Sequence, residues 1–143
     1  MSPKSLRRLP AFVPVPLRTR TDGWTAQRQA EFLAHLALTG LVGKAAKAVG
    51  MTRETAYRLR GREGAESFAA AWDTILLRLC GMGAMHARKV TLYELKARAL
   101  HGTLRPLTYD GAFTDIAQEH DTKALLRLSR RQFSARRRSA ATK

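Results

Sequence analysis

Residues 42–62, VGKAAKAVGMTRETAYRLRGR, form the stretch that most constrains how this chain folds. The pattern predicts two short helices, at about 42–49 and 53–60, joined by a tight turn around Gly50. Glycine suits that turn because it adopts positive φ angles without steric cost. Ala46, four residues earlier, is small at the point where the two helices should cross. The stretch therefore predicts a closely crossed helix pair.

The two faces of the second helix differ in chemistry. Ala56 and Leu59 recur at helical spacing and form its inner face, and the hydroxyl of Thr52 can cap its first turn. An ordinary αα-hairpin in a helical core would share these features, but it would not need a polar and basic outer face. The candidate binding residues are Thr52, Arg53, Thr55, Tyr57, Arg58 and Arg60, with Lys44 and Lys47 from the first helix.

This pattern resembles the helix-turn-helix of DNA-binding proteins. In that docking mode the second helix lies in the major groove, with its N-terminal residues at the base edges. The resemblance implies that the outer residues of the second helix contact double-stranded DNA. Their chemistry fits, because arginine can donate two hydrogen bonds to guanine, threonine can touch a thymine methyl group, and hydroxyl groups can bond phosphates.

The charge balance also favours a polyanionic partner. The 143 residues include 26 Lys and Arg against 11 Asp and Glu, a formal net charge of +15, which is typical of proteins that bind nucleic acid or an anionic membrane surface. No apolar run approaches the roughly 20 residues that span a bilayer, and prolines break the N-terminus where a signal peptide would be apolar. We therefore expect a cytoplasmic protein. The single Cys80 excludes an internal disulfide and is expected to be a small core residue.

The N-terminal part is predicted to comprise an arm and a compact domain. Residues 1–21 are basic and proline-rich, and we expect them to be extended or disordered, beside the DNA groove when DNA is bound. A helix capped by Thr25 and stopped by Gly40 should follow and buttress the helix pair. Together these helices predict a three-helix helix-turn-helix domain over residues 22–64.

Residues 65–133 are predicted to continue as a long helical segment with a hairpin inside it. Glycines at 81 and 83 should kink the helix or break it briefly, and an apolar stripe on each side of them is expected to face the core or another subunit. Asp110-Gly111 predicts a short β-hairpin near 104–117, in which Pro106 should restrict its strand to a sheet edge.

The C-terminal end is predicted to be a helix followed by a tail. Asp121 can cap the helix, which should end near residue 133, and residues 134–143 are expected to form a basic disordered tail. The candidate accessory phosphate contacts of the two basic ends are Arg18, Arg20, Arg136, Arg137 and Arg138. The chain is therefore expected to be mainly α.

A second resemblance covers residues 22–73, from DGWTAQRQAEFLAHLALTG through GAESFAAAWD. This segment is similar to small helix-turn-helix proteins of alphaproteobacteria and their prophages, some of which are described as like the phage terminase small subunit. The resemblance implies recognition of viral DNA, homo-oligomerisation through the later helices, and delivery of DNA to a terminase large subunit. Residues 81–143 carry no such resemblance.

No catalytic site or cofactor site is evident in the sequence, so we do not expect an enzyme. The four histidines are scattered without partners at metal-ligand spacing, and no glycine-rich phosphate loop is present. Three functions stay open: a terminase small-subunit-like recognition protein, a transcriptional regulator with the same motif, and a non-specific basic nucleic-acid-binding or architectural protein. The oligomeric state separates the first two, and sequence preference separates the third.

Overall fold

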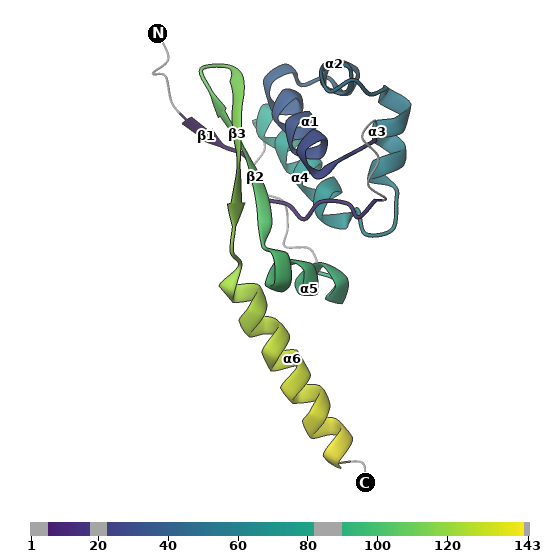
Figure 1. Cartoon of the computed structure of the whole chain (residues 1–143), viewed down its shortest axis with the longest axis vertical. Helices are drawn as coiled ribbons and strands as arrows, with labels where there is room; N and C mark the ends of the chain where they lie inside the picture. Colours follow the sequence, from purple (N-terminus) through teal and green to yellow (C-terminus); the bar gives the residue numbers. More distant parts are fainter. Residues whose placement is uncertain (1–5, 18–22, 82–89, 142–143) are drawn as a thin grey trace.

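The computed structural model describes residues 6–17, 23–81 and 90–141. Within them the protein is mainly helical, with one small three-stranded antiparallel sheet (Figure 1). The elements in chain order are β1 (Leu6–Arg8), α1 (Ala26–Thr39), α2 (Val42–Ala48), α3 (Arg53–Arg60), α4 (Glu66–Leu79), α5 (Leu92–His101), β2 (Thr103–Tyr109), β3 (Ala112–Glu119) and α6 (Thr122–Ala141).

Capping residues fix the ends of α1 and the start of α3, as the sequence predicts. The Thr25 hydroxyl accepts a hydrogen bond from the Arg28 N–H at 3.2 Å, and Gly40 ends α1 in a left-handed conformation with φ of 71°. The hydroxyls of Thr52 and Thr55 form a reciprocal capping box at the start of α3. The local signals in this part of the chain therefore place its helices correctly.

An aromatic cluster holds α1 and α4 together. Phe32 is fully buried, and its ring centroid lies 5.0 Å from that of Trp72 and 6.0 Å from that of Phe68. Trp24 meets the same Phe32 ring edge-on at 5.4 Å, so it is a packing residue. Ala46 and Ala56 are fully buried against this cluster, which brings α2 and α3 onto the same core.

The N-terminal segment is part of the fold, which differs from the expected free arm. β1 pairs antiparallel with β2, and an isolated bridge joins Phe12 to Leu104. Phe12 is fully buried, and its ring meets Phe68 at 6.0 Å. The extended conformation expected from the prolines is present over residues 6–17, but Phe12 and Val15 of this segment belong to the hydrophobic core. Residues 1–5 and 18–21 of the predicted arm lie outside the described residues.

Two buried polar side chains fasten this segment to the helices. The Gln29 amide accepts from the Val15 N–H at 2.7 Å and donates to the Val15 carbonyl at 3.2 Å, as a neighbouring strand would. The hydroxyl of Ser67, on α4, accepts from the Val13 N–H at 2.8 Å. Because the segment leaves the sheet here, these side chains satisfy backbone groups that would otherwise be buried without partners.

The predicted hairpin is present as β2 and β3, but β2 is the central strand, so the expected edge position of Pro106 is wrong. The Pro106 carbonyl accepts from the Leu9 N–H at 3.1 Å, so the missing proline N–H would also face the N-terminal segment. There the Leu9 carbonyl accepts from the Arg105 guanidinium at 2.9 Å instead. Between the last β1–β2 pair, at Arg8, and the Phe12–Leu104 bridge, the strand pairing is irregular. This irregular stretch accommodates Pro106 in a central strand.

An ionic cluster lies on the face of the sheet that includes Arg105. Glu119, at the end of β3, pairs with Arg105 at 2.8 Å and with Arg8 of β1 at 2.6 Å. Hydrogen bonding to Arg105 is the main cause that lowers the pKa of Glu119 from its ordinary 4.5, with a further contribution from Arg8. One carboxylate therefore joins all three strands.

The segment predicted to be helical on both sides of Gly81 and Gly83 forms two separate helices, α4 and α5, with the sheet following. Gly81, after α4, is left-handed with φ of 72°, while residues 82–89 lie outside the described residues. At the end of α5, Gly102 is required because a Cβ there would collide with the Glu119 carbonyl oxygen. Cys80 is exposed, so the prediction of a core position for it is wrong.

The C-terminal helix is longer than the sequence predicts. Asp121 accepts from the Ala124 N–H at 3.0 Å and starts α6 as expected, but the helix continues through Ala141, so the described part of the predicted tail is helical. Alanine and arginine have high helix propensity, and extending an existing helix needs no new nucleation. α6 packs on α5 at its base and projects from the body over most of its length (Figure 1). Among the described helices, none combines the length and the apolar character needed to cross a membrane.

Candidate nucleic-acid interface

Four of the predicted binding residues line one open groove between α2 and α3. The groove has a volume of about 600 Å³ and begins at the turn between α1 and α2. Its lining residues are Gly40, Leu41, Val42, Gly43, Lys44, Lys47, Arg53 and Tyr57. The lining thus includes three cationic side chains and no acidic one, which makes this groove a place where anions would collect.

The turn between α2 and α3 sets the two sides of the groove. The Met51 N–H donates to the Ala46 carbonyl at 2.9 Å, and the Gly50 N–H donates to the Lys47 carbonyl at 3.0 Å. Gly50 has φ of 74° as the sequence predicts, and that conformation reverses the chain within two residues. Lys44 and Lys47 consequently stand on α2 opposite the first turns of α3, and both are exposed.

A stack of side chains supports the α3 side of the groove. The Arg53 guanidinium lies over the Tyr57 ring, 5.7 Å from its centroid. The Tyr57 ring in turn lies 5.3 Å from that of Trp72, which is buried in the core. Tyr57 itself stays 47% exposed although its ring contacts the core. The core therefore orients an arginine without burying it.

The other predicted residues of α3 divide into two groups. Arg58 is exposed, and Thr52 and Thr55 stand at the N-terminus of α3, where their hydroxyls serve the capping box. Arg60 points the other way: it pairs with Asp73 of α4 at 2.7 Å and lies over the Trp72 ring at 5.1 Å. The structure thus places Arg60 outside the groove, in a contact that holds α3 against α4.

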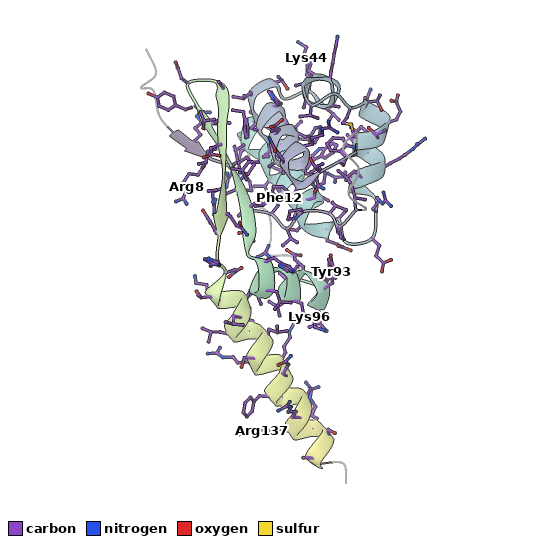
Figure 2. All side chains as sticks on the ribbon, viewed as in Figure 1. Arg8, Phe12, Lys44, Tyr93, Lys96 and Arg137 are labelled. Atoms are coloured by element: carbon purple, nitrogen blue, oxygen red, sulfur yellow. The ribbon has the colours of Figure 1, made fainter. Side chains whose placement is uncertain are left out.

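The predicted accessory contacts lie away from this groove. Arg18 and Arg20 are outside the described residues. Arg136, Arg137 and Arg138 lie on the distal half of α6, and Figure 2 shows Lys44 and Arg137 at opposite ends of the molecule. α6 is about 30 Å long at 1.5 Å per residue. The structure therefore separates the α2–α3 groove from a second basic region that the sequence grouped with it.

Sequence reasoning missed the organisation of that second region. One face of α6 has basic residues at spacings of three, four and seven, without an acidic residue on the whole helix. The members of this basic face are Lys123, Arg127, Arg130, Arg131, Arg137 and Arg138. The helical spacing of the arginines could have revealed this basic face. That spacing continues beyond residue 133, into the residues expected to form a disordered tail.

The groove-lining residues that the sequence analysis did not identify are non-polar. Leu41 is 53% exposed at the start of α2, and Val42 and Gly43 follow it in the lining. An exposed leucine between two helices gave no sequence signal, because its position after Gly40 is that of an ordinary connector. In the structure these residues add a non-polar part to the lining beside the lysines.

Within the described ranges, no group of three or more His, Cys, Asp or Glu residues is placed to hold a metal ion. Comparisons of the chain with protein-family models, with curated proteins and with solved structures gave no match.

Proposed function

We propose that this protein binds double-stranded DNA with sequence preference, using α1, α2 and α3 as a helix-turn-helix unit. The observation that carries the proposal is the α2–α3 groove, where Lys44, Lys47, Arg53 and Tyr57 surround an open surface without an acidic residue. In this docking mode α3 lies in the major groove and α2 crosses the phosphate backbone.

Each candidate contact residue of α2 and α3 then has a distinct role. Arg53, held by Tyr57, and the exposed Arg58 donate to guanine edges, while Thr52 and Thr55 are near enough to the helix N-terminus to contact a phosphate or a thymine methyl group. Lys44 and Lys47 neutralise phosphates, a contribution that depends on ionic strength and not on sequence. Specificity would therefore reside in α3 and most of the salt dependence in α2 and α6.

Within this proposal, packaging recognition like that of a terminase small subunit is the first assignment and transcriptional regulation the second. Both need self-association to present several copies of α3 to DNA. Exposed apolar side chains suited to such contacts lie on α5 and α6. They are Leu92, Leu100, Leu125, Leu126 and Phe133. A ring of eight or more subunits would favour packaging with a large subunit as partner, and a dimer would favour regulation.

The basic face of α6 favours a second candidate function, binding of nucleic acid through charge alone. Like charges three and four residues apart, such as Arg127 with Arg130 and Arg131, destabilise an isolated helix, and a polyanion would remove that repulsion. Such binding would show no sequence preference.

Selection of bound sites from random duplex DNA tests the proposal. The full chain should enrich a defined sequence, and Lys44→Ala with Lys47→Ala should weaken binding to all duplexes alike. Light scattering on the same samples gives the oligomeric state. Recovery of unenriched random sequences would reject specific recognition and favour the charge-only alternative.

A further inference from the structure

A second pocket shares no lining residue with the α2–α3 groove. It has a volume of about 290 Å³ and lies where β1 meets the last turns of α1 and α4. Its lining residues are Arg7, Arg8, Leu9, Ala37, Leu38, Ile75, Arg78, Leu79 and Thr108. Leu79 is 51% exposed and Leu38 37% exposed, so the pocket presents apolar side chains to solvent. Its volume suits one or two apolar side chains of a partner.

Two arginines give this pocket a positive rim. Arg7 pairs in register with Thr108, and paired residues of antiparallel strands project to the same face, so Arg7 lies on the pocket side of the sheet. Arg78 adds a second cation from α4. Arg8 also lines the pocket, but its guanidinium pairs with Glu119. Across residues 6–17, 23–81 and 90–141, no ion pair joins Arg7 or Arg78 to a carboxylate.

The pocket adjoins an open strand edge. β1 is the first strand in the order β1-β2-β3, and no strand among the described residues pairs with its outer side. The Leu9 N–H donates to the Pro106 carbonyl, so the alternation of an antiparallel ladder turns the N–H and C=O of Arg8 outward. An extended peptide can hydrogen-bond to such an edge, and its alternate side chains then reach the pocket side.

We infer that this pocket and the β1 edge bind an extended acidic peptide segment of a partner protein, anchored by one aliphatic side chain. The anchor fills the apolar space between Leu38 and Leu79, and carboxylates two residues before and after it face Arg7 and Arg78. Charge complementarity selects this occupant, because a second copy of a chain with net charge +15 would bring its own cations to the rim. None of its lining residues belongs to the groove proposed for DNA.

Two fluorescein-labelled peptides of one composition test the inference. Thr-Asp-Thr-Leu-Thr-Glu-Thr places its leucine and both acids on one face of a strand, whereas Thr-Asp-Leu-Thr-Thr-Glu-Thr moves the leucine to the other face. Fluorescence anisotropy with the full chain should give at least about tenfold weaker binding for the second peptide, since its leucine stays in water. Equal binding of the two peptides, or no binding of either, would overturn the inference.

Matched variants locate the binding. Arg78→Glu and Leu79→Ser should each weaken the first peptide at least about tenfold, whereas Arg130→Glu and Leu126→Ser, comparably exposed on α6, should leave its affinity within about twofold. The charge variant Arg78→Glu replaces one of the two rim cations at an exposed position, and the thermal midpoint of each variant monitors folding. Lys44→Glu with Lys47→Glu should retain peptide binding even if DNA binding is abolished. If the Lys44→Glu, Lys47→Glu protein does not bind the peptide, or if the α6 variants weaken the peptide as much as Arg78→Glu does, net charge alone attracts the peptide. Either result would overturn the proposed peptide site.

Discussion

Replacing Arg53 separates sequence recognition from charge. In the free protein its guanidinium lies over the Tyr57 ring at 5.7 Å, an exposed cation–π contact of about 0.5–1 kcal/mol. Arg53→Ala should therefore lower the thermal midpoint by only a few degrees. On the preferred duplex, removal of a bidentate hydrogen bond to guanine should cost about 1–3 kcal/mol, or roughly 5- to 150-fold in affinity. The effect on DNA should thus exceed the effect on stability.

The assay compares two duplexes, with three variants measured against the unmutated protein. Anisotropy at one fixed ionic strength gives the affinity for the selected sequence and for a scrambled duplex of equal length. Arg53→Lys keeps the charge but not the planar donor fork, so it should lose most of the specific affinity and little of the non-specific affinity. Arg130→Ala, the matched removal of an exposed arginine on α6, should weaken both duplexes equally. Equal losses on both duplexes for Arg53→Ala would refute base recognition by this side chain.

Three further outcomes test other parts of the account. Phe12→Ala should destabilise the fold by about 3–5 kcal/mol in chemical denaturation, because a fully buried ring is removed, whereas Leu41→Ala at a half-exposed site should change it by less than about 0.5 kcal/mol. An unchanged stability for Phe12→Ala would contradict the packing of the N-terminal segment on the core. Because the folded-state pKa of Glu119 is lowered, its ion pairs stabilise the fold above the ordinary value of 4.5 and lose that effect as the pH falls through the lowered pKa. The free energy of unfolding should therefore fall less steeply below about pH 4.5 for Glu119→Gln than for the unmutated protein. The same pH dependence in both proteins would count against the ionic cluster. Deleting residues 134–143 should reduce the slope of log affinity against log salt by about 0.9 for each phosphate that these residues neutralise, and an unchanged slope would remove this part of α6 from the interface.

Local chemistry explains which parts of the fold were predictable. Thr25, Gly40, Gly50 and Thr52 each act within a few residues of their own position, so their sequence context was enough to place the ends of α1 and the turn before α3. Exposure of Arg53 also followed from helical spacing alone. These features depend on interactions that a short window of sequence contains.

Non-local pairing explains what was missed. Phe12 is held by Leu104, far along the chain, and its segment has no helical or alternating period that the prolines leave intact. Pro106 is tolerated in a central strand only because Arg105 takes the bond to the Leu9 carbonyl. Arg60 looked like its neighbours on α3, and only the position of Asp73 on α4 assigns it to a structural contact. None of these partners is identifiable without the folded chain.

The central claim is that the residues of the α2–α3 groove contact DNA, and a nuclear magnetic resonance titration tests it most directly. Uniformly ¹⁵N-labelled protein is titrated with the selected duplex, and amide shifts are followed along the whole chain. The account predicts the largest shifts at Lys44, Lys47, Arg53 and Tyr57, with smaller changes on α6 that shrink as salt is raised. Shifts confined to α6, with the groove amides unmoved at saturation, would contradict it.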